Sequence, residues 1–262
     1  MAWIALLLGV VEGLTEFLPI SSTGHLILVS HVVGFTGKRA EIFEVFIQLG
    51  AILAVVWEYR SRLWRVVRQL PSRPESRTFA RNLVVAFLPA AGLGLLLHLV
   101  ISDHLFTPGS AAAALITGGI LILVVESLPL SARTREVDGI SRAQAVLIGL
   151  AQCLALWPGF SRSAATILGG LAVGLDRRTA TEFSFFLAIP TMFAATIYDL
   201  IIHHSWLEPG DLVWLALASA ASFAVALVAI RWLLRYVAHH DLRPFAWYRL
   251  ALGVLALLLL RR

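Results

Sequence analysis

The run EGLTEFLPISSTGH, residues 12–25, interrupts an apolar N-terminal stretch with two carboxylates, a proline, four hydroxyl groups and a histidine. Charged side chains are costly inside a bilayer, and where they occur there they usually mark a functional site. Pro19 removes a helical hydrogen bond and disrupts the helix that precedes it. The stretch 1–35 therefore predicts two short helices that meet at a polar break.

A second stretch, 143–175, is broken in the same way by PGFSRS at residues 158–163. The apolar segments beside each break are shorter than the ~20 residues that a helix needs to cross a hydrocarbon core of roughly 30 Å. Irregular backbone is tolerated at membrane depth only where protein buries it or it lines a cavity. We therefore expect 1–35 and 143–175 to be re-entrant hairpins.

The composition of the 262-residue chain indicates a polytopic membrane protein. Hydrophobic residues make up 59% and charged residues 14%, and the mean hydropathy is +0.84, whereas a soluble domain needs more surface charge. The predicted fold class is all-α, with six transmembrane helices plus two re-entrant helical hairpins in a single integral membrane domain, 1–262. The approximate limits of the six spans are Ile42–Tyr59, Asn82–Ile101, Ala111–Pro129, Glu182–His203, Leu212–Leu234 and Phe245–Leu260.

Several classes of protein do not fit this sequence. Cys153 is the only cysteine, which excludes an internal disulfide, and no Cys/His cluster predicts a zinc site. The net charge of +5 does not indicate nucleic-acid binding, because seven arginines crowd the connection 60–81, as in a solvated cytoplasmic loop beside anionic lipid. Met1–Val11 lacks a basic leading region and runs straight into Glu12, so we expect no cleaved signal peptide.

The basic residues also set the predicted orientation. With 60–81 in the cytoplasm and both hairpins re-entrant, 16 of the 21 Lys and Arg residues fall inside, four fall outside, and Arg162 lies within the second hairpin. This bias follows the positive-inside rule and places both termini outside. The inside connections are 60–81, 131–142, 174–181 and 235–249, and the outside ones are 36–41, 102–110 and 203–211.

The chain repeats itself at one constant offset, which is the separation of Ser21 from Ser161. Each unit holds one hairpin and three spans, and an odd number of spans turns the second unit upside down. We predict inverted repeats of approximately 1–130 and 141–262, a plan in which broken helices meet at the membrane midplane. The other pairs aligned at this offset are Gly9 and Gly149, Glu12 and Gln152, Phe43 and Phe183, Phe46 and Phe186, and Ala54 and Ala194.

The acidic pair of the first break predicts a charged centre. Glu12 and Glu16 are four residues apart, so their carboxylates share one helix face. Two neighbouring carboxylates either raise one another's pKa or share a cation. Acids at the membrane surface would give the same pattern, but the residues around this pair are Leu, Val, Phe and Gly.

The hydroxyls after Pro19 predict an anion site. Ser21 and Thr23 stand where a helix begins, and free N–H groups and the helix dipole attract anions there. His25 follows Ser22 by three residues, so its imidazole can approach the serine hydroxyl and a carboxylate can orient it. The same residues also fit a capping box followed by an interfacial histidine, and spacing leaves both interpretations open.

The second break supplies a cation. Arg162 is flanked by hydroxyls at Ser161, Ser163 and Thr166. A guanidinium with hydroxyls and a helix N-terminus suits a phosphate oxyanion, which needs bidentate donors and positive potential. Arg162 could also pair with the glutamates of the first break to neutralise buried charge. The two interpretations are compatible, because an empty phosphate site can rest as an ion pair.

At this point the sequence resembles a known family. The run 12–25 closely resembles the first signature of the undecaprenyl-diphosphate phosphatase family (BacA/UppP type), and Trp157–Ser163 with Thr166 resembles the second. The likeness covers nearly the whole chain, although Ala164 stands where the family usually has glycine. Two further segments, Phe43–Gly50 and Glu182–Phe185, resemble segments that the family has between and after these signatures.

The resemblance implies hydrolysis of undecaprenyl diphosphate to the monophosphate and inorganic phosphate, which recycles the lipid carrier for cell-wall peptidoglycan synthesis. It also implies bacitracin resistance on overproduction and a multi-pass protein of the bacterial cell membrane whose site opens outward. The implied cofactor is a divalent cation, Mg²⁺ or Ca²⁺. The expected partners are the polyprenyl diphosphate substrate and membrane lipid, without nucleic acid, and a homodimer stays open.

The family's functional residues carry over to matching positions of this sequence. The resemblance implies Glu12 and Glu16 as the acidic motif that holds the metal, Glu16 also as a catalytic residue, Ser22 as the nucleophile, His25 as its base and Arg162 as the catalytic, phosphate-binding arginine. The hydroxyls around that arginine are Ser161, Ser163 and Thr166.

Two rival functions come from the same features. A transporter or flippase of a phosphorylated polyprenyl lipid would also use inverted repeats with broken helices. A transporter needs no nucleophile beside a base, so Ser22 and His25 favour an enzyme. A cation channel built on Glu12 and Glu16 fits poorly, because Arg162 would repel the cation. The sequence does not decide the roles of three further polar residues: Glu44, Gln48 and Glu182.

Overall fold

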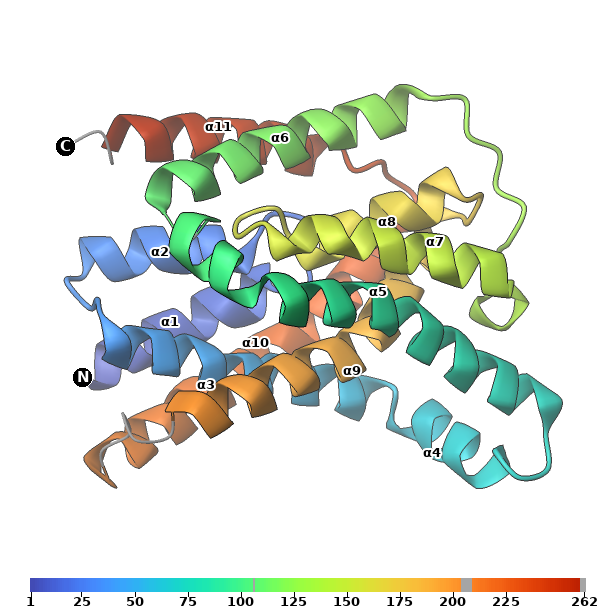
Figure 1. Ribbon diagram of the computed structural model, residues 1–262, viewed down its shortest axis with the longest axis horizontal. Coiled ribbons are helices and arrows are strands. Elements are labelled where there is room, and N and C mark those ends of the chain that lie inside the picture. Colours follow the sequence, from blue (N-terminus) through green and yellow to red (C-terminus); the bar gives the residue numbers. More distant parts are fainter. Residues whose placement is uncertain (106, 204–208, 260–262) are drawn as a thin grey trace.

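The computed structural model describes residues 1–105, 107–203 and 209–259, and this part of the chain folds into α-helices, with a long connection between α6 and α7 (Figure 1). The first six are α1 (Ala2–Thr15), α2 (Ser22–Val32), α3 (Lys38–Glu58), α4 (Arg60–Gln69), α5 (Pro74–Leu105) and α6 (Pro108–Ser127). The others are α7 (Arg142–Gln152), α8 (Arg162–Ala172), α9 (Arg177–His203), α10 (Leu212–Val237) and α11 (Arg243–Leu259). Short 3₁₀ turns occur at η1 (Val137–Gly139), η2 (Cys153–Leu156) and η4 (Pro209–Asp211).

Four of the described helices are long and apolar enough to cross a membrane. They are α5 over Pro74–Leu97, α6 over Gly109–Ser127, α9 over Arg177–Ile202 and α10 over Leu212–Val237. The helices α3 and α11 occupy the other two predicted spans. The predicted last residue of the α11 span, Leu260, lies outside the described residues. The predicted class, a helical membrane protein, is confirmed.

Two helix pairs occupy the predicted hairpins. The helix α1 ends at Thr15 and α2 begins at Ser22, while η2 ends at Leu156 and α8 begins at Arg162. The two helices of each pair, α1 with α2 and α7 with α8, pack against each other. The predicted polar breaks are therefore confirmed as the places where the chain turns between two short helices.

The two breaks share one backbone geometry. Ser21 and Ser161 both have a positive φ, 72° and 78°, a conformation that costs a residue with a side chain about 1–3 kcal/mol. Each serine caps the following helix by accepting a hydrogen bond from a backbone N–H, that of Gly24 at 3.3 Å and that of Ala164 at 3.2 Å. The separation of the two serines defines the repeat offset, so this shared geometry supports the predicted repeat.

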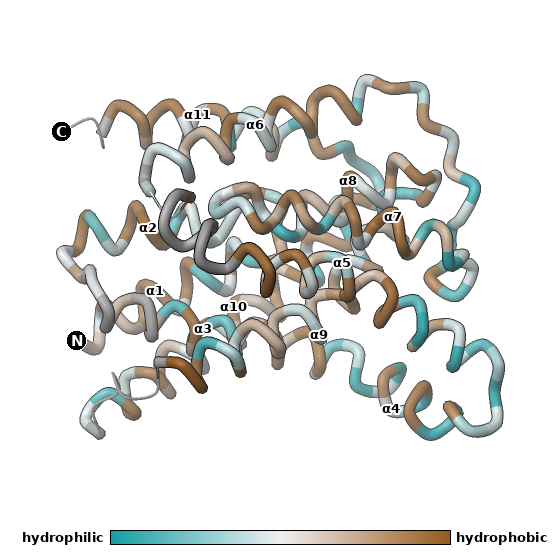
Figure 2. Tube along the Cα trace, viewed as in Figure 1, coloured by the Kyte–Doolittle hydropathy of each residue, from teal (hydrophilic) through white to brown (hydrophobic). Residues whose placement is uncertain are grey.

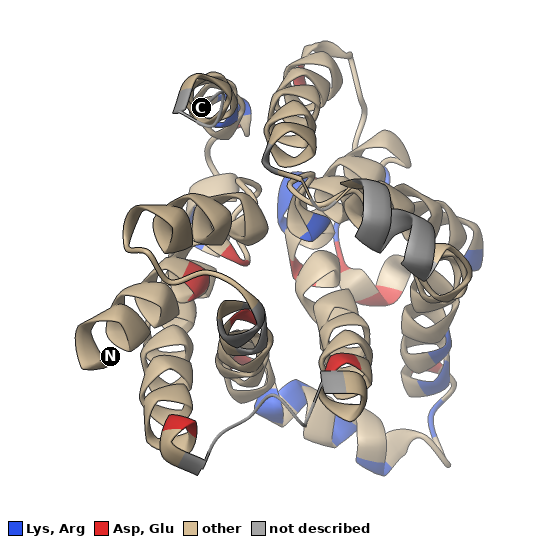
Figure 3. Cartoon of the chain, turned by 60° about the vertical axis from the view of Figure 1, so that its left-hand side comes forward, with Lys and Arg blue, Asp and Glu red and all other residues tan. Residues whose placement is uncertain are grey.

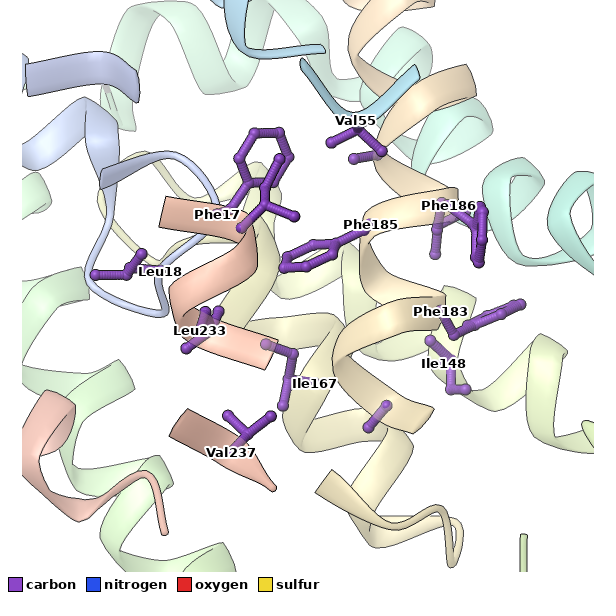
Figure 4. Packing of buried hydrophobic residues seen from close by; sticks show 14 of the residues in the cluster. Phe17, Leu18, Val55, Ile148, Ile167, Phe183, Phe185, Phe186, Leu233 and Val237 are labelled. Carbon is purple, nitrogen blue, oxygen red and sulfur yellow. The ribbon is translucent and has the colours of Figure 1, made fainter. Parts of the chain in front are cut away.

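Phe17 anchors the first break in the main hydrophobic core. Its ring is fully buried and meets the ring of Phe185 edge-on, with the ring centroids 5.4 Å apart (Figure 4). Phe185 belongs to α9, which packs against α3, α5, α8 and α10. Burial of an aromatic ring is worth several kcal/mol. Apolar packing and polar contacts therefore both fix the position of this break.

The connections predicted to lie inside the cell contact one another at one end of the bundle. Arg62 of α4 donates to Asp138 at 2.7 Å, and the backbone N–H of Thr134 donates to the carbonyl of Gly174 at 3.0 Å. Hydrophilic residues gather at this end, around α4 and the first turns of α5 (Figure 2). Most Lys and Arg residues lie away from the N-terminus (Figure 3), a distribution that fits the predicted orientation.

Glu126 closes the same end. Its carboxylate, 2% exposed, accepts two hydrogen bonds from the guanidinium of Arg177 and one from the backbone N–H of Leu242 at 3.0 Å. Its backbone carbonyl accepts a hydrogen bond from Arg243 at 3.3 Å. One buried acid therefore holds together the end of α6, the beginning of α9 and the connection from α10 to α11.

The arginine-rich connection 60–81 differs from the predicted loop. Its first half forms α4, and its second half is the beginning of α5, which starts at Pro74 and thus well before the predicted Asn82. Leu63 and Val66 of α4 pack against the hydrophobic core, while Trp64 on the other face is 61% exposed. Apolar residues at helical spacing produced this helix, and the density of arginines concealed that spacing.

Two glycines bring α1 into backbone contact with α10. A β-carbon at Gly9 would overlap the carbonyl oxygen of Ala218, and one at Gly13 would overlap that of Ser222. Small residues four apart let helices approach closely where no hydrophobic effect drives them together. The position of α1, and therefore of the acidic residues at its end, depends on this contact.

Gly9→Ala should push α1 away from α10 and lower the free energy of unfolding by about 1–3 kcal/mol. The measurement is thermal unfolding of the detergent-purified protein. The control is Gly92→Ala in α5, where a β-carbon would meet no atom within 4 Å. Equal unfolding temperatures for the two variants would contradict close packing of α1 on α10.

Candidate active site

The polar residues of the two breaks meet inside the protein. Nη2 of Arg162, the first residue of α8, lies 3.4 Å from Oε1 of Glu16, which caps the end of α1. The two side chains are 11% and 9% exposed. Residues 146 positions apart in sequence thus form a nearly buried ion pair, which is one of the two interpretations that the sequence left open for Arg162.

Ser22 completes a chain of three groups. Its hydroxyl donates to Oε2 of Glu16 at 2.5 Å, so one carboxylate holds the hydroxyl with one oxygen and the guanidinium of Arg162 with the other. Ser22 and Arg162 are each the first residue of a short helix, and each directly follows a capping serine, Ser21 or Ser161. They therefore occupy the same position in the two predicted repeats.

His25 has other partners than the sequence suggested. Its Nδ1 lies 2.7 Å from the carbonyl oxygen of Ser21, and its Nε2 lies 2.6 Å from the hydroxyl of Tyr248. The ring stacks on that of Tyr248, with centroids 5.5 Å apart. Both ring nitrogens are thus engaged, and the partner of the Ser22 hydroxyl is Glu16 instead. The imidazole therefore contacts the Ser21 carbonyl and the Tyr248 hydroxyl and not the Ser22 hydroxyl. The spacing of residues along α2 did not predict these partners.

Arg162 keeps unused hydrogen-bonding capacity. Its Nη1 donates to the backbone carbonyl of Ser184 at 3.1 Å, but its Nε is buried with no hydrogen-bond partner among the described residues. The guanidinium also lies over the ring of Phe17, at 5.8 Å from the centroid. An unpaired buried donor costs free energy, and an additional acceptor such as a phosphate oxygen would remove that cost.

Glu12 is fully buried, and neither carboxylate oxygen has a hydrogen-bond partner among the described residues. Its charged neighbours are Glu16, Glu44 and Arg162. An unsatisfied buried carboxylate fits a cation ligand, and cation binding by the acidic pair stays a prediction. In the described part of the chain no three His, Cys, Asp or Glu side chains converge on one point. Mg²⁺ commonly takes only one or two protein carboxylates, with water and substrate oxygens completing its coordination, so these two residues fit such an ion.

The hydroxyls of the second break mostly hold the backbone. Ser163 donates to the carbonyl of Leu18 in the first break at 2.8 Å and lies 3.0 Å from the hydroxyl of Ser161. Thr166 donates to the carbonyl of Arg162 at 2.9 Å. The hydroxyls of Thr166 and Ser184 are 2.6 Å apart. These contacts position Arg162, and a direct role of the hydroxyls in phosphate binding stays a prediction.

The remaining predicted polar residues differ in how far they are buried. Thr23 is half-buried at the second position of α2, and Gln48 is half-buried in α3. Glu182 pairs with Arg178 one turn away on the surface of α9, at 3.3 Å. Of the acids whose role was undecided, Glu44 is thus the one that belongs to the surroundings of Glu12.

Arg249 is the polar residue whose place the sequence did not predict. It falls in the predicted cytoplasmic connection 235–249, but it lies in α11 with no exposed surface. Its guanidinium donates to backbone carbonyls of both breaks, those of Pro19 and Gly159. The available signal was a charge one helical turn inside the apolar run that begins at Phe245, which is too deep for a loop residue.

The sequence of this chain is similar to those of known proteins. A family model described as "Bacitracin resistance protein BacA" matches residues 5–255. The chain is 56% identical over 254 residues to the undecaprenyl-diphosphatase of Nitrosomonas europaea, covering 97% of this chain and 93% of the relative. It is 53% identical over 261 residues to undecaprenyl-diphosphatase 1 of Paraburkholderia xenovorans, with coverage of 97% and 93%. It is 50% identical over 256 residues to the undecaprenyl-diphosphatase of Pseudomonas aeruginosa, with coverage of 98% and 92%.

Glu16 and Arg162 should be energetically coupled. Arg162→Met leaves buried carboxylates without their cation and should cost about 3–5 kcal/mol of unfolding free energy. The double variant Glu16→Gln/Arg162→Met should cost less than the sum of the single variants, by about 0.5–3 kcal/mol. Denaturant unfolding of the purified protein gives these values.

The matched control for this cycle is the surface pair Arg178 and Glu182. An exposed pair one turn apart contributes about 0.3–0.5 kcal/mol, so Arg178→Met should have little effect. If Glu16 and Arg162 are no more strongly coupled than this surface pair, their contact is not a buried ion pair.

Proposed function

This chain belongs to the bacitracin resistance protein BacA family, and we propose that it is an undecaprenyl-diphosphatase. It hydrolyses undecaprenyl diphosphate to undecaprenyl phosphate and inorganic phosphate, and so recycles the lipid carrier for peptidoglycan synthesis. The observation that carries this proposal is the hydrogen-bonded chain Ser22, Glu16 and Arg162 at the junction of the two breaks. It supplies a hydroxyl, a proton acceptor and a phosphate-binding cation in one nearly buried site.

Arg162 binds the diphosphate. Its ion pair with Glu16 neutralises the site in the absence of substrate, and its unpartnered Nε supplies a donor for an incoming phosphate oxygen. The beginnings of α2 and α8 add free backbone N–H groups and positive helix-dipole potential. Phosphoryl transfer needs mainly positioning and stabilisation of charge on the phosphate oxygens, and a guanidinium at a helix N-terminus provides both.

Ser22, or a water molecule in its place, attacks the terminal phosphorus. Glu16 takes the proton, because its Oε2 already accepts the hydroxyl hydrogen. The anhydride P–O bond breaks and undecaprenyl phosphate leaves. In the serine route water then releases phosphate from Ser22. The predicted role of His25 as the base would require its ring to leave Tyr248, so Glu16 is the better placed acceptor.

Glu12 and Glu16 are the residues that would hold a divalent cation, Mg²⁺ or Ca²⁺. The two unpartnered oxygens of Glu12 support this assignment. Such an ion, when bound, neutralises charge that develops on phosphate oxygens. Glu12 forms no hydrogen bond with Ser22 or Arg162, so cation binding is the role that its position supports.

The proposed topology has six crossings, α3, α5, α6, α9, α10 and α11, and two re-entrant hairpins in the bacterial cell membrane. The repeats are approximately 1–130 and 141–262, and the site opens outward. The mutual contacts of the connections near Glu126 support one common inner end. The shared geometry of Ser21 and Ser161 supports the repeat.

A transporter or flippase of a phosphorylated polyprenyl lipid is the alternative function. It rests on the same inverted repeat with broken helices. It does not explain why a serine hydroxyl donates to a buried carboxylate beside the arginine, because lipid transport forms and breaks no bond. The hydrolase is therefore the function that the site supports better.

Detergent-purified protein should release phosphate from C55 diphosphate when Mg²⁺ or Ca²⁺ is present. Arg162→Lys should lower kcat/KM by about 10²–10³-fold, because a point charge cannot replace bidentate donors to the phosphate. Arg178→Lys on the surface is the control and should match the wild type. A wild-type protein that releases no phosphate would overturn the proposed activity, and full activity of Arg162→Lys would show that charge alone suffices.

Cysteine labelling tests the orientation. In a Cys153→Ser background, Thr36→Cys in the connection from α2 to α3 should react with a membrane-impermeant maleimide added outside intact cells. Ser72→Cys in the connection from α4 to α5 should react only after the membrane is permeabilised. Both positions are exposed, so the membrane sets the difference in reactivity, and reaction of the two from the same side would overturn the topology.

A further inference from the structure

Four backbone carbonyls surround the guanidinium of Arg249. Its Nε donates to Leu115 at 3.2 Å, its Nη1 to Pro19 at 3.2 Å, and its Nη2 to Ala114 at 3.1 Å and to Gly159 at 3.3 Å. Arg249 is completely buried, and none of the described acidic residues forms an ion pair with it. A buried cation without a counterion is costly, and here carbonyl oxygens offset that cost together with the ring of Phe160, whose centroid lies 5.8 Å from Cζ of Arg249.

Two of these carbonyls are equivalent positions of the repeat. Pro19 stands two residues before Ser21, and Gly159 stands two residues before Ser161, so the repeat offset also relates this pair. One guanidinium therefore binds the same backbone group in both breaks, one with Nη1 and the other with Nη2. Arg249 joins the two halves of the protein at their point of pseudo-symmetry, although it belongs to only one of them.

The carbonyls of Pro19 and Gly159 lie just before the residues of the site. Ser21 and Ser161, two residues after the carbonyls, hold a positive φ, and such a conformation persists only where surrounding contacts impose it. The next residues are Ser22 and Arg162. The hydrogen bonds of Arg249 therefore fix the backbone from which both the hydroxyl and the phosphate-binding cation project.

We propose that Arg249 is a positioning residue for the diphosphatase reaction, so this inference rests on the proposed function. It ties the two breaks together at the separation that lets Ser22 and Arg162 share the carboxylate of Glu16. It acts through the backbone, since its described hydrogen bonds include none to these three side chains. A reacting geometry displaced by about 1 Å can cost about 10²-fold in rate.

Gly118 of α6 makes room for this arginine. A β-carbon at Gly118 would overlap Nη2 and crowd Cζ of Arg249. Gly118→Ala therefore moves the guanidinium away from Ala114 and Gly159 while leaving its charge in place. This variant shifts Arg249 and keeps its charge and its contacts through Nε and Nη1, whereas Arg249→Met would leave all four carbonyls without their donor and prevent a fair test of position.

The activity test uses full-length Arg249→Lys and Gly118→Ala with C55 diphosphate, and Gly92→Ala as the matched control in an open position of α5. We expect kcat to fall by about 10²-fold with KM close to the wild-type value, because contacts with the bound substrate persist while the reacting groups are misaligned. The control should keep wild-type values. Rates are normalised to the folded fraction from thermal unfolding, so unchanged kcat in both variants would overturn the positioning role.

A distance measurement without substrate tests whether Arg249 holds the two breaks together. Spin labels at His31→Cys in α2 and Ala172→Cys in α8, both exposed, report the placement of one hairpin against the other in a Cys153→Ser background. Gly118→Ala should broaden the distance distribution, and Gly92→Ala should not. An unchanged distribution in Gly118→Ala would overturn the inference.

The two measurements separate this inference from the proposed function. If wild-type protein releases no phosphate, the proposed function fails and the role of Arg249 in that reaction fails with it, while the distances still decide whether Arg249 joins the breaks. If wild-type protein is active and the distances change while kcat does not, the tie exists but does not position the reacting groups, which overturns the proposal.

Discussion

The contact between Glu16 and Arg162 is the interaction on which the rest of this structure depends. In an apolar bundle neither charge has water to solvate it, so each needs a partner within the protein. Their side chains come from the breaks of two different hairpins and are nearly buried. In the proposed topology the two hairpins therefore bring charge into the membrane only together, and the long helices around them hold the pair in place.

The breaks create a second need, which the chain meets with backbone contacts. A helix that stops inside a membrane leaves carbonyl and N–H groups without partners. Ser21 and Ser161 cap the helices that follow, and Ser163 donates across to the carbonyl of Leu18. Arg249 donates hydrogen bonds to backbone carbonyls of both breaks. The cation that the sequence placed in a loop is thus needed in the middle of the bundle, because two interrupted helices end around it.

The sequence predicted what local rules control and missed what only packing decides. Pro19 and the PGFSRS run marked both breaks, since proline and polar residues disrupt a helix in any context. The pairing of Arg162 with a glutamate of the first break was one of the two interpretations that the sequence left open, because few other charges interrupt the apolar stretches. The partner of His25 was missed, since Tyr248 lies 223 residues away and no local pattern connects them. The burial of Arg249 was missed because an arginine near the start of a span also suits a membrane surface.

The predicted repeat accounts for two unlike groups at equivalent positions of one fold. Ser22 and Arg162 occupy the same position, the first residue after a strained capping serine. Glu12 has Gln152 as its counterpart, so the acidic pair occurs in one repeat only. A strictly symmetric pair of breaks would hold two hydroxyls or two cations, and would not place a hydroxyl beside a cation. The two breaks share a backbone geometry at Ser21 and Ser161, while their side chains differ: a hydroxyl with its carboxylate on one side and the proposed phosphate-binding cation on the other.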